Sequence, residues 1–138
     1  ITVTQGEVKT TKFAANIPIY LQVKDLLIQQ IVTGVYPPGQ KIPSVRELAE
    51  KLTTNPRTIQ NALKELISAE VLKTRRGQGN FVTTDQALIE RLKKQEIQAA
   101  TEKFLNKLKP YLSLEEIIAT LVEVDRQRGG QETWKKQD

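Results

Sequence analysis

Five polar side chains share one face of a predicted helix that begins at Pro56. They are Arg57, Thr58, Gln60, Asn61 and Lys64. When a helix lies in the major groove of DNA, an Arg can make two hydrogen bonds to guanine, and Gln or Asn can do the same with adenine. Most surface helices have a polar face simply because water covers it. The face therefore indicates base recognition only if the surrounding elements place it on DNA.

The composition excludes several kinds of catalytic chemistry. The chain contains no Cys and no His. It therefore cannot supply a cysteine nucleophile, an imidazole base, a Cys/His zinc site or a disulfide. We find no convergent set of carboxylates, Lys and Ser that would replace them. The sequence thus predicts no enzyme, no metal site and no cofactor.

The positive charge is confined to one part of the chain. The formal net charge is +5, and the whole excess lies in residues 1–84, whereas residues 85–138 are balanced. A basic region of this kind favours a polyanionic partner such as nucleic acid. No apolar run approaches the ~18 residues of a membrane span, and residues 1–16 lack the apolar centre of a secretory signal. We expect a cytoplasmic protein with no membrane partner.

Three helices are predicted in the first half of the chain. The first covers 19–33, where apolar residues recur at helical spacing. The second opens with a capping box at Ser44–Glu47. The third opens at Asn55–Pro56, which suit the N-cap and the first helical position. Its apolar positions are Ile59, Ala62, Leu63, Leu66 and Ile67.

A β-hairpin is predicted after these helices. The strand-like segments 71–75 and 80–83 flank the sequence Arg76-Gly77-Gln78-Gly79. Two glycines in a short basic loop are typical of a hairpin tip. Because an isolated hairpin is marginally stable in water, residues 40–42 are our candidate for a third strand.

Two further helices are predicted beyond the hairpin. Asp85 caps one that continues to about Lys109, and a capping box at Ser113–Glu116 opens the second. The polar residues 131–138 are expected to fray. An amphipathic pair has to bury its apolar side, and we expect it to do so in a homodimer. The predicted dimerisation residues are Leu92, Ile97, Phe104, Leu108, Ile117 and Leu121.

Together these elements predict a mainly α fold with a small β-hairpin wing (α+β). An N-terminal winged helix-turn-helix is followed by a short two-helix C-terminal dimerisation region. We assign residues 1–16 to an N-terminal extension, 17–84 to the winged DNA-binding domain and 85–138 to the dimerisation region with its frayed tail. In such a fold the third helix enters the major groove, and Arg75 and Arg76 bring charge to the wing.

Residues 17–84 resemble the DNA-binding domain of GntR-type bacterial transcriptional regulators. The motifs that carry the resemblance stand in the family's order and spacing. They are Pro18-Ile19-Tyr20, the segment 36–49 that opens with Tyr36-Pro37-Pro38-Gly39, the segment 55–66 and the segment Arg76-Gly77-Gln78-Gly79-Asn80-Phe81-Val82. The Asn55-Pro56 helix start and the short region after the wing are similar to the YtrA-type subfamily.

The resemblance implies a transcriptional regulator, which we expect to be a repressor, that binds a palindromic operator in double-stranded DNA as a homodimer. It implies that Arg46 contacts the DNA backbone or a base, and that Gly79, with Gln78 beside it, enters the minor groove. The predicted DNA-binding residues are Lys41, Ser44, Arg46, Arg57, Thr58, Gln60, Asn61, Lys64, Arg75, Arg76, Gln78 and Gly79.

Two other functions remain open at this point. A nonspecific architectural nucleic-acid-binding protein would have the same charge and fold but no operator, and its specificity ratio at fixed salt would reveal it. A winged helix can also be a protein-interaction scaffold, which would have no salt-dependent affinity for DNA. The sequence also leaves open whether a small-molecule effector binds, and it does not identify one. We expect any pocket for it between the C-terminal helices and the winged domain.

Overall fold

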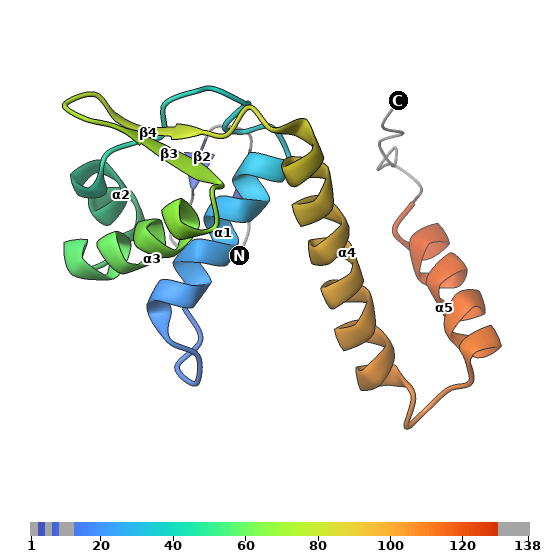
Figure 1. Cartoon of the computed structure of the whole chain (residues 1–138). Coiled ribbons are helices and arrows are strands. Elements are labelled where there is room, and N and C mark those ends of the chain that lie inside the picture. The colour runs from blue at the N-terminus through green and yellow to red at the C-terminus, as the bar shows by residue number, and fades with distance from the viewer. Residues whose placement is uncertain (1–2, 5–6, 9–12, 130–138) are drawn as a thin grey trace. The chain divides into compact units, whose positions relative to one another are not determined.

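The computed structural model describes residues 3–4, 7–8 and 13–129. Its elements, in chain order, are β1 (Val3–Thr4), β2 (Glu7–Val8), α1 (Ile19–Val32), α2 (Val45–Leu52), α3 (Pro56–Ser68), β3 (Leu72–Arg75), β4 (Gly79–Val82), α4 (Gln86–Leu108) and α5 (Leu114–Gln127) (Figure 1). The chain divides into two compact units, Ile1–Glu96 and Ile97–Asp138, which we call the winged unit and the helical unit. The predicted fold class is confirmed.

Helix α1 begins after Pro18 and ends at Val32, and its C-cap Thr33 is followed by Gly34 with a φ of +83°. Its buried Gln22 fastens the preceding segment. The Gln22 side chain accepts a hydrogen bond from the Ala14 N–H at 2.8 Å and donates to the carbonyls of Ala14 and Ile17, both at 2.8 Å. The last residues of the predicted extension 1–16 are therefore part of the folded winged unit. The short strands β1 and β2 pair antiparallel before them.

The two capping predictions for α2 and α3 are confirmed. In α2 the Ser44 hydroxyl accepts from the Glu47 N–H, and the Glu47 carboxylate accepts from the Ser44 N–H, both at 3.1 Å. In α3 the Asn55 side chain accepts from the Arg57 N–H at 2.8 Å. Between the helices Thr53 has a φ of +48°, the left-handed conformation that reverses the chain in a short turn. These local contacts set where α3 begins.

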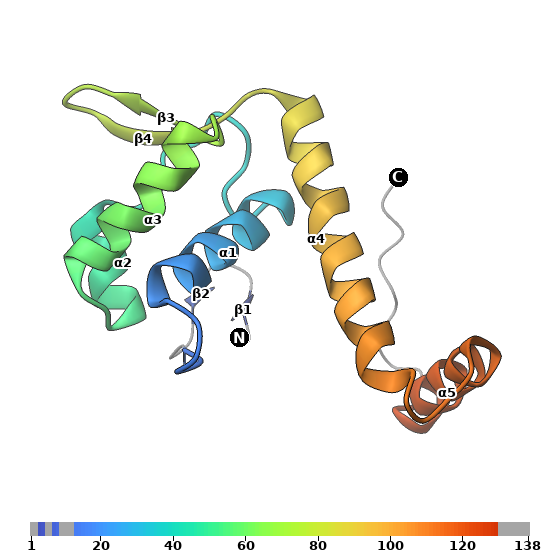
Figure 2. The ribbon, with the colours of Figure 1, turned by 60° about the horizontal axis from the view of Figure 1, so that its bottom comes forward.

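The core of the winged unit lies where α1, α2, α3 and the base of the hairpin meet (Figure 2). Five of its members, no more than 1% exposed, are Val23, Leu26, Ile59, Leu66 and Leu72. Burial of such a side chain contributes roughly 1.5–3 kcal/mol. The core therefore holds α3 in a fixed position relative to the hairpin.

The wing is a hairpin with a short third strand. Strands β3 and β4 pair antiparallel, with Leu72 opposite Val82 and Arg75 opposite Gly79. On the other edge of β4, Lys41 forms a bridge with Phe81, and the Val82 N–H donates to the carbonyl of Gln40 at 2.9 Å. The third strand predicted at 40–42 is therefore present as a single bridge. Gly79, placed by prediction in the tip, is the first residue of β4 instead.

Helix α4 begins in the winged unit. Asp85 accepts a hydrogen bond from the Leu88 N–H at 3.1 Å, as its predicted role as a cap requires. Leu88 is buried, and Ile89 and Leu92 pack against the core. The first residues of α4 therefore belong to the winged unit, which extends to Glu96.

The helical unit contains the end of α4 and the whole of α5. The predicted capping box of α5 is confirmed, because Ser113 and Glu116 exchange hydrogen bonds of 3.1 and 3.2 Å. The tail predicted to fray, 131–138, lies outside the described residues. In the part of the chain that is described, no helix is long and apolar enough to cross a bilayer.

Candidate nucleic-acid interface

Helix α3 separates its residues cleanly into two faces. The predicted base-reading side chains of Arg57, Gln60, Asn61 and Lys64 are exposed, and Thr58 is half-buried. The opposite face, which includes Ile59, Ala62, Leu63 and Leu66, is buried in the core. This burial leaves α3 no freedom to rotate, so the polar face is presented to solvent as a fixed surface.

The N-terminus of α2 adds a cation and a capping box beside this surface. Arg46 is exposed, and its Nε lies 3.7 Å from a carboxylate oxygen of Glu50 one turn later. Such a surface pair is weak, so the guanidinium can exchange it for a phosphate. The backbone N–H and the side chain of Ser44 hydrogen-bond to Glu47 and hold the pKa of that carboxyl below its usual value. The polar groups of Ser44 are thus engaged within the capping box.

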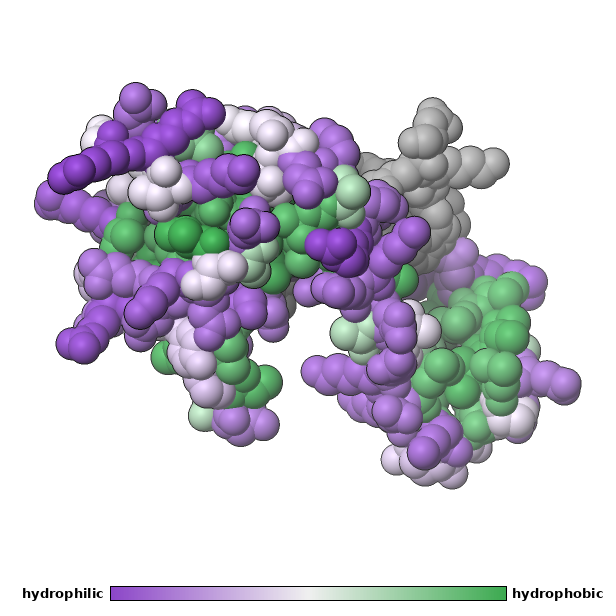
Figure 3. All heavy atoms as spheres, viewed as in Figure 1, coloured by the Kyte–Doolittle hydropathy of each residue, from purple (hydrophilic) through white to green (hydrophobic). Residues whose placement is uncertain are grey.

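A groove lies between α3 and the hairpin. Its volume is about 350 Å³. The lining residues are Val45, Gln60, Leu63, Lys64, Ile67, Ser68, Thr74 and Asn80. Figure 3 shows apolar side chains gathered in this region, with hydrophilic ones bordering them. Thr74 and Asn80 lie opposite each other in the hairpin, and the Thr74 hydroxyl hydrogen-bonds to the Asn80 side chain at 2.7 Å.

Of the residues that line this groove, only Gln60 and Lys64 belong to the predicted DNA-binding set. The sequence pattern places Ile67 on the apolar face of α3, yet it is 37% exposed. It places Thr74 and Asn80 only in strands. The cross-strand alternation of the hairpin could have placed the last two on one face, but the approach of α3 to that face is a tertiary contact that a single sequence does not indicate.

A second groove lies on the other side of α3, against α1. Its volume is about 810 Å³, and Tyr20, Lys24, Asn61, Lys64 and Glu65 are among its lining residues. Lys24 and Glu65 form an ion pair of 3.0 Å across it. The polar face of α3 therefore stands between two grooves, with Lys64 lining both.

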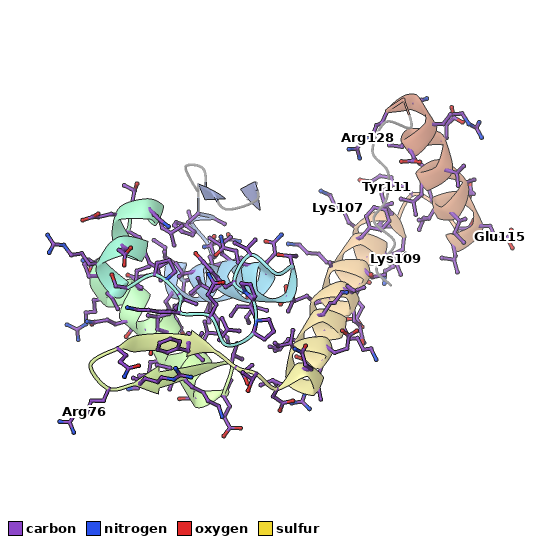
Figure 4. All side chains as sticks on the ribbon, turned by 90° about the horizontal axis from the view of Figure 1, so that it is seen from above. Arg76, Lys107, Lys109, Tyr111, Glu115 and Arg128 are labelled. Carbon is purple, nitrogen blue, oxygen red and sulfur yellow. The ribbon has the colours of Figure 1, made fainter. Side chains whose placement is uncertain are left out.

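The tip of the wing is basic. The Arg75 guanidinium carbon lies 4.2 Å from the centroid of the Phe81 ring, a cation–π contact that holds this side chain against the sheet. Arg76 extends from the tip away from the hairpin (Figure 4). Gln78 is also exposed, and its N–H donates to the carbonyl of Arg75 at 2.9 Å to close the turn.

The predicted dimerisation residues fall into two groups. Ile97, Phe104 and Leu121 are exposed, and Figure 3 shows further apolar side chains gathered over α5. Leu108 is half-buried. The other two make contacts within the chain. Leu92 packs on the core of the winged unit, and Ile117 is 3% exposed.

Within the described residues, no group of three or more His, Cys, Asp or Glu side chains could hold a metal ion. The exposed side chains of α3 and of the wing tip offer hydrogen-bonding groups and positive charge. A basic, hydrogen-bonding helix face next to a basic hairpin tip matches the two adjacent grooves of a DNA duplex.

Comparison with known sequences agrees with this geometry. The family model described as bacterial regulatory proteins, gntR family, matches residues 19–82. The chain is 36% identical over 98 residues to the uncharacterized HTH-type transcriptional regulator YhcF of Bacillus subtilis (strain 168), covering 71% of this chain and 81% of YhcF. It is 38% identical over 69 residues to the HTH-type transcriptional repressor YtrA of the same strain, covering 50% of this chain and 53% of YtrA.

Solved structures have the same architecture. A GntR family transcriptional regulator from Listeria monocytogenes matches with a TM-score of 0.75 at 41% sequence identity, covering 80% of this chain and 98% of that one. The structure of AraR(DBD) in complex with operator ORX1 matches with a TM-score of 0.52 at 30% identity, covering 56% of this chain and 98% of that one.

Proposed function

Because the chain belongs to the gntR family of bacterial regulatory proteins, we propose that it is a sequence-specific regulator that binds a palindromic operator as a homodimer and represses transcription. The members to which it is similar are DNA-binding regulators and not enzymes. The repressor role is supported by the name of the relative YtrA. Because a regulator works where the genes lie, the proposal places the protein in the cytoplasm.

The exposed polar face of α3 is the observation that carries the proposal. Arg57, Gln60 and Asn61 lie in its first two turns, and the N-terminal part of a recognition helix is the part that reaches base edges. Arg57 is suited to guanine, whereas Gln60 and Asn61 are suited to adenine. These three side chains read the sequence, and Lys64, one turn further on, neutralises a phosphate.

The groove between α3 and the hairpin accommodates one sugar–phosphate strand. With α3 in the major groove and the wing tip in the adjacent minor groove, the strand that separates the two DNA grooves passes between them. Ile67 offers an apolar surface to the deoxyribose carbons. Asn80 and Lys64 are placed at the lining to hydrogen-bond to phosphate oxygens. These contacts set the register of the protein on DNA without reading bases.

The helical unit supplies the dimer interface. Exposed large apolar side chains on α5 include Leu114, Ile118, Leu121 and Val122. A soluble monomer rarely exposes so many on one helix, and a second copy of the chain provides a matching surface about a two-fold axis. A two-fold dimer then requires an operator with two-fold symmetry. The YtrA-type assignment belongs to this proposal as well, since YtrA matches over the winged part.

The deciding experiment is selection of binding sites from a random DNA pool at about 150 mM salt, which suppresses weak nonspecific binding. We expect the recovered sites to share an inverted repeat. We also expect the electrophoretic mobility shift of such a site to require two protein chains per DNA duplex. Recovery of DNA without any shared motif would contradict sequence-specific regulation and favour an architectural role. Absence of salt-dependent binding to any duplex would contradict the proposal altogether and favour a scaffold.

A further inference from the structure

The side chain of Lys41 lies directly against Gly79, at the start of the strand that leaves the wing tip. A Cβ atom built on Gly79 would come within 2.7 Å of Lys41 Cε and 3.6 Å of Lys41 Nζ. Real Cβ atoms do not approach carbon so closely. The absence of a side chain at Gly79 is therefore what lets Lys41 cross the sheet at this point.

The pairing of the strands places this contact on the solvent face of the wing. Lys73 and Lys41 stand on either side of Phe81, and Arg75 is opposite Gly79. Partners across an antiparallel pair, and alternate residues along a strand, lie on the same face of a sheet. Three cations thus surround Phe81 and Gly79 on one face, which we call the outer wing face.

The cations of the outer wing face have no acidic partner in the wing. The segment 71–84 contains no Asp or Glu. No ion pair among the described residues includes Lys41, Lys73 or Arg75. Arg75 is instead held against Phe81. Cations that are positioned by the sheet but not neutralised within it are suited to an external anion, and on DNA that anion is phosphate.

We propose that Gly79 is a positioning residue for Lys41, which acts as part of the wing and brings its ammonium group to a backbone phosphate beside the wing tip. Gly79 then affects binding through Lys41 and not through an approach of its own backbone to the minor groove. This inference rests on the proposed DNA-binding function. It differs from the role that the family resemblance implies for Gly79, and it adds Lys73 and Arg75 as neighbours on the same face.

The contact predicts how a Gly79→Ala variant behaves. The new Cβ meets the far part of a flexible Lys side chain, which moves aside without unfolding the core. Gly79 has a φ of +119°, so Ala is strained there. That strain is the same whether residue 41 is Lys or Ala, and it cancels in a comparison of the two backgrounds.

A double-mutant cycle on the selected operator tests the inference. The proteins are the wild type, Lys41→Ala, Gly79→Ala and the double variant, with affinities measured from 50 to 200 mM salt. Losing one phosphate contact lowers the slope of log affinity against log salt by about 0.9. We expect both single variants to show this lower slope. The ratio of wild-type affinity to variant affinity should therefore shrink about threefold as salt rises from about 50 to 200 mM. The double variant should have the same salt slope as Lys41→Ala.

Gly34→Ala is the matched control. Gly34, after α1, also has a positive φ, +83°, but a Cβ there meets nothing within 4 Å. We expect it to keep the wild-type salt slope, and thermal unfolding of every variant confirms that the fold is retained.

The outcomes separate this inference from the proposed function. If Gly79→Ala weakens binding as much in the Lys41→Ala background as in the wild type, Gly79 acts on DNA directly and the inference is wrong while DNA binding stands. An unchanged salt slope in Lys41→Ala would show that Lys41 contacts no phosphate, and the inference would again be wrong while DNA binding stands. If the wild type binds no duplex, the proposed function and the inference both fail.

Discussion

At the scale of single residues, the proposed recognition of DNA depends on a few side chains whose backbone is fixed by buried neighbours. Arg57 follows the cap of α3, and its own N–H is bonded to Asn55. Its guanidinium therefore leaves a defined point on the helix. Arg57 differs in this respect from Arg76, which extends from a turn (Figure 4). We assign base reading to the first and charge neutralisation to the second.

Replacement of Arg57 by Ala tests that assignment. We expect a loss of ~1–3 kcal/mol in binding free energy on the operator and a relaxed preference at one base position in each half-site, because a bidentate contact is removed. Affinity for random DNA should fall much less. Competition binding with operator and random duplexes measures both. Lys94→Ala, at an exposed position of α4, is the control. Equal losses on the two DNAs would show that Arg57 only neutralises phosphate.

The polar residues of α3 could be found from the sequence because the cap marks where the helix begins and the spacing of its apolar residues marks which side is buried. Ile59 and Leu66 mark that side, and all the predicted polar positions lie away from it. The groove residues Ile67 and Asn80 could not be found in the same way. Their role arises from the approach of the hairpin to α3, which depends on contacts between distant segments.

At the scale of elements, the start of α2 has two functions that a substitution can separate. Ser44 caps the helix, and it is also a predicted DNA-binding residue. Asp is as good an N-cap as Ser, but its charge repels phosphate. The two roles therefore predict opposite behaviour for Ala and Asp at this position.

Ser44→Ala should lower the free energy of unfolding by about 1 kcal/mol at pH 7, whereas Ser44→Asp should leave it nearly unchanged. The pKa of Glu47 is lowered in the folded protein, from an ordinary value of 4.5, by its hydrogen bonds to Ser44. That contribution is complete above the ordinary pKa and is lost as pH falls through the lower folded value. Because Ala retains the backbone N–H that donates to the Glu47 carboxylate, Ser44→Ala should keep most of this pH dependence.

Denaturant unfolding at pH 7 and pH 3, together with operator binding, provides the measurements. Stable but weakly binding Ser44→Asp would confirm a phosphate close to the helix start. Wild-type affinity in Ser44→Asp would remove Ser44 from the interface. Ser113→Ala, in the equivalent capping box of α5, should lose stability in the helical unit without changing the salt slope of DNA binding.

The elements themselves were well predicted where the signal is local. Both capping boxes, the Asn55–Pro56 start and the hairpin turn depend on residues within a few positions of one another. The bridge between Lys41 and Phe81 joins residues forty positions apart. The sequence could nominate residues 40–42 for it, but only the fold shows that the pairing is one bridge long.

At the scale of the whole molecule, the division between the two compact units falls within helix α4. Helix α4 continues through it, so the helical pattern carries no sign of the division. Leu92 is a predicted dimer residue because it lies on the apolar side of α4. Within one chain it packs on the winged core, and an apolar position on a helix does not by itself specify which partner covers it.

Leu121→Glu tests the proposed dimer. Leu121 is 50% exposed, so the charge should be tolerated within one chain but not in an apolar interface between two. We expect a monomer by sedimentation, unchanged helix content by circular dichroism and a large loss of affinity for the inverted repeat. Glu115→Ala, on the same helix (Figure 4), should remain dimeric. A Leu121→Glu protein that still sediments as a dimer would place the interface elsewhere.

The small sheet of the wing also has a consequence for the tendency of the protein to aggregate when it is not bound to DNA. One edge of its small sheet is covered by residues 40–42, whereas the outer edge of β3 pairs with no strand among the described residues. An open edge is a template for strand pairing between molecules, and charged side chains along it are a protection against aggregation. Lys73 and Arg75 stand on that edge. The same cations that suit phosphate thus also keep neighbouring chains from joining through their wings.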